Sequence, residues 1–218
     1  MARILLTSGP TRQYLDPVRY ITNASSGRMG AAIAQVAIQL GHQVEIVSGP
    51  VAIEYPSAAR VVQVVTTEEM HQQVSVRFPD CDCLIGVAAP CDYMPRRVLD
   101  HKLTKTGEPL HLELIETVDI VASMGVRKSP GQYVVGFALE TEDRRFRAIN
   151  KMQRKCCDLI VSNSESAIDS QSNSIEILAP GGETVALAEG SKLEVARVIM
   201  RVVEERLLQS NSKAKHES

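Results

Sequence analysis

The feature that most constrains the fold is an alternation of strand-length apolar runs with segments of helical periodicity. The run at residues 83–89 (CLIGVAA) is apolar throughout, as expected of a central strand buried on both faces of a parallel sheet. The other strand-length runs lie at residues 4–7, 44–48, 61–65, 133–138 and 159–162. This alternation predicts an α/β fold with a Rossmann-like, doubly wound, mostly parallel sheet.

The segments between these runs have an apolar residue every three or four positions, which is typical of helices packed on a sheet. The expected helices span residues 27–40, 67–78, 118–127, 142–157 and 191–208. Gly41 ends the first helix, Thr66 or Thr67 caps the second, and Ser191 caps the last.

The C-terminal part departs from this pattern. Residues 175–178 and 184–186 flank Pro180-Gly181-Gly182, which predicts a C-terminal antiparallel hairpin. Residues 209–218 (QSNSKAKHES) are small and polar, so we expect a disordered tail there. Because the sequence has no internal repeat and no linker, we expect residues 1–208 to form one domain.

Composition and charge exclude several classes of protein. The 218 residues are 44% hydrophobic with a formal net charge of −2, which argues against a nucleic-acid partner or an anionic membrane surface. The N-terminus lacks the apolar region and cleavage site of a signal peptide. No run approaches the roughly 20 apolar residues that span a bilayer. We therefore expect a soluble, cytoplasmic protein.

The cysteines give no metal or disulfide pattern. The five are Cys81, Cys83, Cys91, Cys156 and Cys157. An odd number in C-x-C and C-C pairs fits neither a disulfide framework nor paired zinc ligands. We expect reduced cysteines that pack as small hydrophobic residues, with a catalytic thiol at Cys91 as the alternative.

The loop between the first strand and the first helix is rich in Asn, Ser and Gly. Residues 19–30 read RYITNASSGRMG. Backbone amides at a helix start, small side chains and hydroxyl donors together predict an anion site. The spacing matches neither G-x-G-x-x-G nor the P-loop motif. In the alternative interpretation, Ser25 or Ser26 only caps the helix.

The alternation is interrupted after the run at residues 83–89. Residues 90–114 contain two early prolines and a central Gly107, and their apolar residues alternate on either side of it. We expect a flap at about residues 95–114, a hairpin with arms at 102–105 and 110–114. Such an excursion leaves the carboxyl end of a central strand, where open α/β sheets bind ligands.

Polar residues follow several strand ends and predict a nucleoside triphosphate site. These residues are Thr7–Thr11 with the loop 23–30, the segment 88–93, the flap lysines, and the segment 137–140. Lysines neutralise phosphate charge, Asp92 could hold a divalent cation, and Phe137 could lie against a base. The alternatives are a turn-forming Asp92, a core Phe137, and lysines on a solvated strand.

Five motifs resemble one enzyme family. They are SGPTRQYLDPVRYITNASSGRMG at residues 8–30, AAPCDY at 88–93, KLTK at 102–105, GFALET at 136–141 and DLIVSN at 158–163. From residue 4 to about residue 208, the chain resembles phosphopantothenoylcysteine synthetase, the ligase that joins 4′-phosphopantothenate to cysteine in coenzyme A biosynthesis. Bacterial members are often fused to a flavin-dependent decarboxylase. This sequence does not include that decarboxylase, so we expect a stand-alone synthetase or an excised domain.

The resemblance implies a ligation in two half-reactions. A nucleoside triphosphate, CTP in most bacterial members and ATP in eukaryotic ones, activates the substrate carboxylate as an acyl-nucleotide, and the amine of cysteine then displaces the nucleoside monophosphate. We expect CTP here. The resemblance also implies Mg²⁺ or Mn²⁺, and a homodimer whose flap reaches across the subunits.

Site residues follow from the same resemblance. Asn23 matches the residue that holds the acyl-nucleotide, and Lys102 matches the catalytic lysine of the flap. Asp92 matches an aspartate beside the metal and the nucleotide. The expected nucleotide-binding residues are Gly9, Ser25, Ser26, Gly27, Ala88, Asp92, Lys105 and Phe137.

The sequence also departs from the family pattern. Pro90 and Cys91 replace small apolar residues before Asp92, and Pro90 lacks a backbone donor for a base or ribose. Glu116 stands where a lysine is frequent, Thr117-Val118-Asp119 stands for Asn-Pro-Asp, and Asn163-Ser164 for Asn-Asp.

These departures leave three alternatives open. They are the same ligase with ATP, a non-catalytic relative, and an NAD(P)-binding reductase. No G-x-G-x-x-G follows the first strand, which argues against the reductase. Retention of Asn23, Lys102 and Asp92 argues against the non-catalytic relative.

Overall fold

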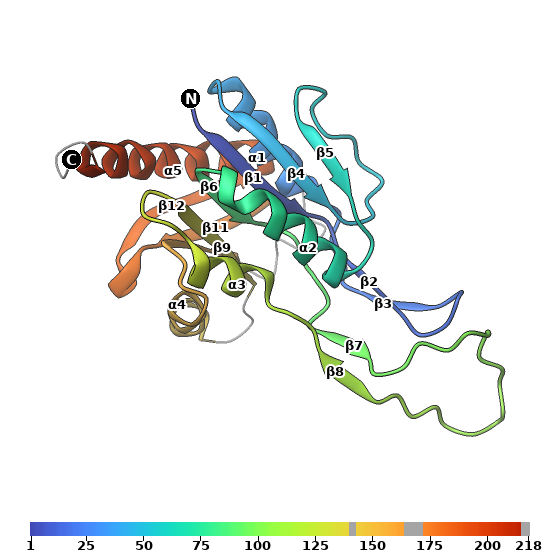
Figure 1. Ribbon diagram of the computed structural model, residues 1–218. Coiled ribbons are helices and arrows are strands. Elements are labelled where there is room, and N and C mark those ends of the chain that lie inside the picture. The colour runs from blue at the N-terminus through green and yellow to red at the C-terminus, as the bar shows by residue number, and fades with distance from the viewer. Residues whose placement is uncertain (140–142, 164–171, 215–218) are drawn as a thin grey trace.

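An eight-stranded sheet forms the centre of the computed structural model, which describes residues 1–139, 143–163 and 172–214 (Figure 1). Its parallel strands are β1 (Arg3–Ser8), β4 (Gln43–Ser48), β5 (Arg60–Gln63), β6 (Cys83–Gly86), β9 (Tyr133–Leu139) and β10 (Leu159–Asn163). The antiparallel strands β11 (Ser172–Leu178) and β12 (Thr184–Ser191) extend one edge.

The strand order is β12-β11-β10-β9-β6-β1-β4-β5. Its parallel part follows the order of a doubly wound dinucleotide-binding fold, and the order reverses between β1 and β6. The predicted fold class and the C-terminal hairpin are confirmed.

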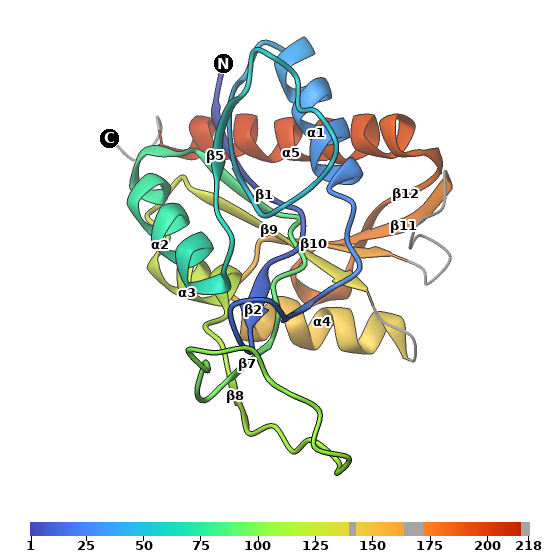
Figure 2. The ribbon, with the colours of Figure 1, turned by 90° about the vertical axis from the view of Figure 1, so that its right-hand side faces the viewer.

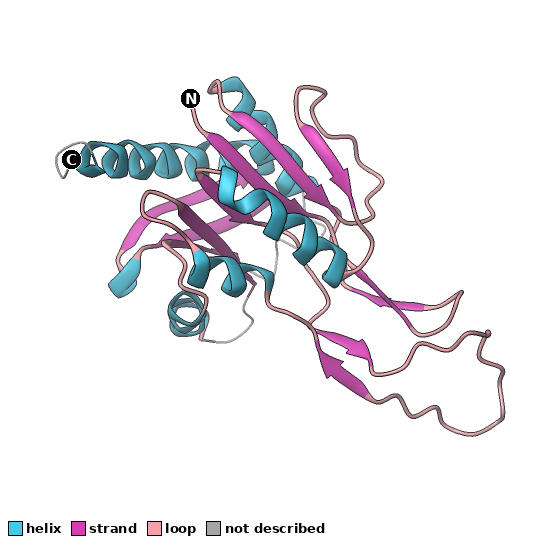
Figure 3. Ribbon diagram, in the orientation of Figure 1, coloured by secondary structure: helices cyan, strands magenta, loops and turns pink. Residues whose placement is uncertain are grey.

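Helices cover both faces of this sheet (Figures 2 and 3). They are α1 (Arg28–Gln39), α2 (Thr67–Arg77), α3 (Ile120–Arg127), α4 (Arg144–Arg154) and α5 (Lys192–Ala214), with short 3-10 helices η1 (Phe78–Asp80) and η3 (Pro180–Gly182). All the predicted helices are present. The start predicted at residue 142 lies outside the described residues.

The alternation of side chains along β1 divides the core in two. Ile4 and Leu6 pack with α1 and α5 on one face, whereas Leu5 packs with α2, α3 and α4 on the other. All three side chains are buried, as expected of a strand at the centre of a three-layer fold.

The predicted N-terminal caps of α2 and α5 are confirmed. Thr66 and Glu69 form a capping box at α2, and Ser191 and Glu194 form the same reciprocal pair at α5. α5 continues to Ala214, so the predicted start of a tail at residue 209 is wrong for the backbone. Gln, Lys and Ala favour helix, and no Gly or Pro ends it. Residues 215–218 lie outside the described residues.

The segment between β1 and α1, which the sequence predicted as a loop, contains a small hairpin. β2 (Arg12–Tyr14) pairs with β3 (Tyr20–Thr22), and both strands are too short to show periodicity in the sequence. The buried strand β6 is shorter than predicted. Beyond Gly86 the chain bonds to the loop after β1, where Ala89 N donates to Gly9 O at 2.9 Å.

The flap leaves the body of the molecule beside that hairpin (Figure 1). Its base is β7 (Tyr93–Pro95) paired with β8 (Leu114–Glu116), and residues 96–113 between them form no strand. The predicted arms at 102–105 and 110–114 are wrong apart from Leu114. Because Leu110 and Leu112 are exposed, the alternating pattern buries no apolar face that could stabilise a ribbon.

Among the described residues, none of the helices combines the length and the apolar composition that crossing a bilayer requires.

Candidate active site

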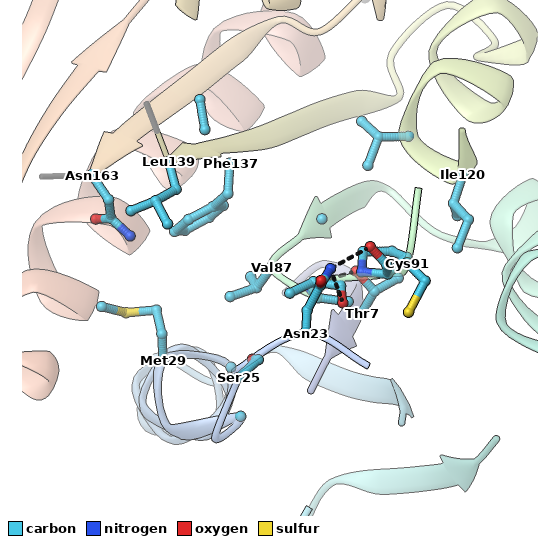
Figure 4. Close-up of a pocket in the computed structure, with 18 of the residues that line it drawn as sticks. Thr7, Asn23, Ser25, Met29, Val87, Cys91, Ile120, Phe137, Leu139 and Asn163 are labelled. Atoms are coloured by element: carbon cyan, nitrogen blue, oxygen red, sulfur yellow. Dashed lines mark hydrogen bonds between the residues drawn. The ribbon is translucent and has the colours of Figure 1, made fainter. Parts of the chain in front are cut away.

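A cavity of about 540 Å³ lies beyond the carboxyl ends of β1 and β6, where the strand order reverses (Figure 4). Open α/β sheets bind ligands at this position because the connections on either side diverge and leave a crevice. Its walls come from residues 23–30, 86–92 and 117–121, together with the ends of β9 and β10 and parts of α4 and α5.

The start of α1 forms one wall and has the properties of an anion site. Gly27 caps α1 with a φ of 75°, and a Cβ there would lie 2.9 Å from Val51 Cγ1. Within the described chain, no side chain caps α1 and no acidic residue lies in its first turn. The first amides therefore stay available, next to the hydroxyls of Ser25 and Ser26. The alternative in which Ser25 or Ser26 only caps the helix is wrong.

Asn23 connects this wall to the next one. Its Nδ2 donates to Pro90 O at 2.8 Å and to Ala89 O at 3.3 Å (dashed in Figure 4). Pro90 has no N–H, but its carbonyl holds the side chain of Asn23. The two acceptors fix the amide at the edge of the cavity, between the loop before α1 and the loop after β6.

Ala88 and Phe137 line the cavity as predicted. Ala88 N donates to Thr7 Oγ1 at 3.2 Å, which fixes the second wall to β1. Phe137 is half-buried: it packs against the core and also lines the cavity, so both interpretations of this residue apply. Figure 4 places Phe137 beside Leu139 and Asn163. Residue 140, expected on the same rim, lies outside the described residues.

Asp92 lines the cavity with an exposed carboxylate. Within the described ranges, no three His, Cys, Asp or Glu residues cluster closely enough to hold a metal ion by themselves. Mg²⁺ usually binds through one or two carboxylates plus substrate phosphates. Asp92 therefore fits a cation that arrives with a nucleotide, and does not fit a dedicated protein cage.

Three cavity lysines were not identified from the sequence. Lys151 and Lys155 lie four residues apart at the end of α4, which puts them on one side of the helix. Lys192 begins α5 and donates to Asn173 Oδ1 at 2.8 Å. The i, i+4 spacing was visible, but an Arg- and Lys-rich helix is usually a solvated surface. Only the fold brings these lysines to the cavity.

The charge of the lining is mostly positive. Lys155 Nζ lies 3.0 Å from Asp119 Oδ2, and Asp119 also caps α3 through a 3.0 Å bond from Ala122 N. Among the described lining residues, the cations Arg28, Lys151, Lys155 and Lys192 outnumber the carboxylates Asp92 and Asp119. Such a surface attracts a polyanion.

Gly9, Lys102 and Lys105 do not line this cavity. Gly9 has a φ of 75°, and its carbonyl accepts a hydrogen bond from Ala89 N in the cavity wall after β6. Lys102 and Lys105 lie on the flap, which extends from the body of the molecule (Figure 1).

Cys91 is not a catalytic thiol. Its side chain is buried, and its Sγ donates to Thr11 O at 3.4 Å and to Ile21 O at 3.5 Å. Burial raises the pKa of the Cys91 thiol, so the thiol stays protonated. All five cysteines are free, and burial raises the pKa of Cys81 and of Cys157 to about 12. Cys156 alone of the five is exposed.

Residues 1–207 match the model of the family described as the DNA/pantothenate metabolism flavoprotein C-terminal domain. The chain belongs to this family. It is 39% identical over 207 residues to the coenzyme A biosynthesis bifunctional protein CoaBC of Vibrio vulnificus, covering 92% of this chain and 51% of that protein. It is 38% identical over 205 residues to CoaBC of Bacillus subtilis, covering 92% and 50%. The chain thus spans about half the length of the curated relatives it matches.

One crystal structure agrees with this family membership. The C-terminal domain of a CoaBC protein is 37% identical, with a TM-score of 0.80 over 95% of this chain and 96% of that domain. The fold is also shared with the Cab2 mutant H337A in complex with phosphopantothenate-cysteine, at 15% identity and a TM-score of 0.83 over 98% of this chain and 89% of Cab2.

Proposed function

We propose that this chain is a phosphopantothenate–cysteine ligase that activates 4′-phosphopantothenate with CTP. The observation that supports this most is the cavity at the strand-order reversal, lined by lysines of α4 and α5 and by the start of α1, which no side chain caps among the described residues. Backbone amides at a helix start and lysine ammonium groups around one cavity suit a triphosphate. The family's relatives are named for coenzyme A biosynthesis, which supports the choice of substrates.

In the first half-reaction, a carboxylate oxygen of 4′-phosphopantothenate attacks the α-phosphorus of CTP. A new P–O bond forms while the bond to the pyrophosphate oxygen breaks, and pyrophosphate leaves with that electron pair. Negative charge builds on the phosphate oxygens, and preorganised donors lower the barrier. We assign Ser25, Ser26 and the α1 amides to the phosphates, and Lys102 and Lys105 to the developing charge.

In the second half-reaction, the amine of cysteine attacks the acyl carbonyl. The C–N bond forms, the C–O bond to CMP breaks, and the amine proton passes to solvent. We assign Asn23 to the acyl-cytidylate, because its amide lies between the phosphate wall and the loop after β6. The substrate carboxylate is the nucleophile of the first step, so no protein nucleophile is needed.

Mg²⁺ or Mn²⁺ would be held by Asp92 and by phosphate oxygens of the nucleotide, where it would neutralise charge on the leaving pyrophosphate.

We further propose a homodimer in which the flap reaches the cavity of a second copy. Two observations support this: Lys102 does not line the cavity of its own chain, and the flap exposes apolar side chains. Val98 is 57% exposed and Leu110 is 60% exposed. A projecting segment with this composition is suited to contact with another protein surface.

The test is turnover with CTP, Mg²⁺, 4′-phosphopantothenate and cysteine, followed by mass spectrometry. We expect phosphopantothenoylcysteine, CMP and pyrophosphate in equal amounts, and we expect chelation by EDTA to stop the reaction. Faster turnover with ATP would reverse the nucleotide assignment. If neither CTP nor ATP gave pyrophosphate, the ligase would be contradicted. Binding of NADPH would then favour the reductase.

A further inference from the structure

The flap is attached to the body of the molecule at the residue after Lys102. Leu103 N donates to Asp16 Oδ2 at 3.1 Å, and Arg19 Nη2 donates to Leu103 O at 2.7 Å. Both backbone polar groups of one flap residue, Leu103, are thus held by the turn between β2 and β3. A further bond joins the same two segments, from Leu99 N to Leu15 O at 3.0 Å.

Asp16 is built to hold this position. Its side chain is fully buried, and its Oδ1 accepts from Val18 N and from Arg19 N, both at 2.8 Å. Arg19 Nη1 lies 3.4 Å from Asp16 Oδ2. Burial by itself raises the pKa of Asp16, but the bonds from Val18, Leu103 and Arg19 outweigh it and keep the pKa below its usual value. The carboxylate is therefore charged at neutral pH and has an acceptor available for the flap.

These contacts decide where Lys102 leaves the main chain. The Cα atoms of Lys102 and Leu103 are about 3.8 Å apart, so fixing the Leu103 backbone restricts the position from which the Lys102 side chain extends. The described contacts of the tip beyond Leu103 are local, such as the bond from Glu108 N to Thr106 Oγ1. Without the bond to Asp16, the flap around Leu103 gains conformational freedom that each turnover must remove.

We propose that Asp16 is a positioning residue for Lys102, acting through the backbone of Leu103. This inference rests on the proposed function, in which Lys102 stabilises the charge that develops during activation. Asp16 is not among the described residues that line the cavity. Its task is to present the flap lysine in one orientation, because a small misplacement of a catalytic group lowers the rate steeply.

The test is a double-mutant cycle of Asp16→Asn and Lys102→Gln, read as steady-state pyrophosphate release with CTP, 4′-phosphopantothenate and cysteine. Asparagine keeps the size of Asp16 but has only one acceptor oxygen for the amides on both sides. We expect Asp16→Asn to lower kcat about 10-fold while the KM for CTP changes less than about twofold. In the Lys102→Gln background, Asp16→Asn should lower the rate by less than about twofold.

Asp100→Asn, an exposed aspartate of the flap, is the matched control and should have the wild-type rate. A wild-type rate for Asp16→Asn would overturn the inference. An equal loss in both backgrounds would also overturn it, because a general folding defect acts whether or not Lys102 is present. If Asp16→Asn does not fold, Arg19→Met removes the other side-chain bond to the Leu103 backbone, and the same pattern is expected of it.

A physical measurement separates this inference from the proposed function. We expect hydrogen exchange of the Leu103 amide to be at least about 10-fold faster in Asp16→Asn than in wild type or Asp100→Asn. Unchanged exchange would overturn the attachment. A wild-type protein that releases no pyrophosphate would contradict the proposed function, and the exchange rates would then decide the attachment alone.

Discussion

Asn23 is the residue whose chemistry is most specific at the candidate site. Its Nδ2 donates to the carbonyls of Ala89 and Pro90, which the carboxylate of an aspartate cannot do. In Asn23→Asp, a carboxylate would face both carbonyl oxygens and would meet the negative charge of the bound intermediate.

We expect Asn23→Asp to fold normally but to stall around the acyl-cytidylate. Mass spectrometry of quenched reactions should show this intermediate accumulating, with little phosphopantothenoylcysteine. Asn150→Asp on the exposed side of α4 makes the same chemical change away from the cavity, and it should turn over normally. Normal turnover in Asn23→Asp would remove Asn23 from the reaction.

Lys102 is exposed on the flap and is assigned to the developing phosphate charge. We expect Lys102→Gln to slow pyrophosphate release about 100-fold or more, the usual effect of removing a main donor to such charge. The adjacent exposed residue provides a control, because His101→Gln should change the rate little. A near-wild-type rate for Lys102→Gln would show that Lys102 is only a solvated residue of the flap.

The sequence correctly predicted which residues beside the strand ends lie together at one cavity. Asn23, Ser25, Ser26, Ala88 and Asp92 all line one cavity. The cavity lysines of α4 and α5 were missed because a helix surface becomes part of a site only through packing of distant segments. No local pattern distinguishes such a lysine from a solvated one.

At the scale of elements, the close approach of α1 to β1 gives the phosphate wall its shape. A Cβ on Gly30 would lie 2.2 Å from Ser8 Oγ and 2.7 Å from Ser8 Cβ, so any larger residue must shift the helix. Ser8 Oγ also donates to Gly27 O at 3.3 Å, which ties the start of α1 to the end of β1.

We expect Gly30→Ala to lower the free energy of unfolding and to weaken nucleotide binding. Overpacking costs about 1–3 kcal/mol, which exceeds the roughly 1 kcal/mol at most that alanine gains over glycine in a helix. Urea denaturation measures the first effect and calorimetric titration with CTP the second. Gln35→Ala, on the exposed side of α1, should change stability by less than about 0.5 kcal/mol. Unchanged stability in Gly30→Ala would contradict the packing described here.

Long elements were predictable and short ones were not. The parallel strands and their helices each bury an apolar face, so hydrophobic periodicity marks them. β2 and β3 have three residues each, and the flap pairs only at its base. Such short strands depend on neighbouring segments, so the sequence predicted a loop for the first pair and misplaced the arms of the second.

At the scale of the whole molecule, the flap and the cavity of one chain are separate. Figure 1 shows the flap extending from the body beside the β2–β3 hairpin. If Lys102 serves the cavity of a second copy, each complete site contains Asn23 of one subunit and Lys102 of the other.

This arrangement predicts complementation between two inactive variants. When Asn23→Asp and Lys102→Gln are mixed and their subunits exchange, each mixed dimer regains one intact site. Random pairing then restores about a quarter of the wild-type activity, since half the dimers are mixed and each has one of two sites. No recovery despite subunit exchange, or a monomeric sedimentation mass under assay conditions, would contradict the shared site.

The most direct test of the ligase is the order in which the products leave. Without cysteine, CTP and 4′-phosphopantothenate should give pyrophosphate in an amount equal to the enzyme, and CMP should appear only when cysteine is added. Orthophosphate with CDP would mean attack at the γ-phosphorus and an acyl phosphate. That result, or no pyrophosphate in the absence of cysteine, would contradict activation through an acyl-cytidylate.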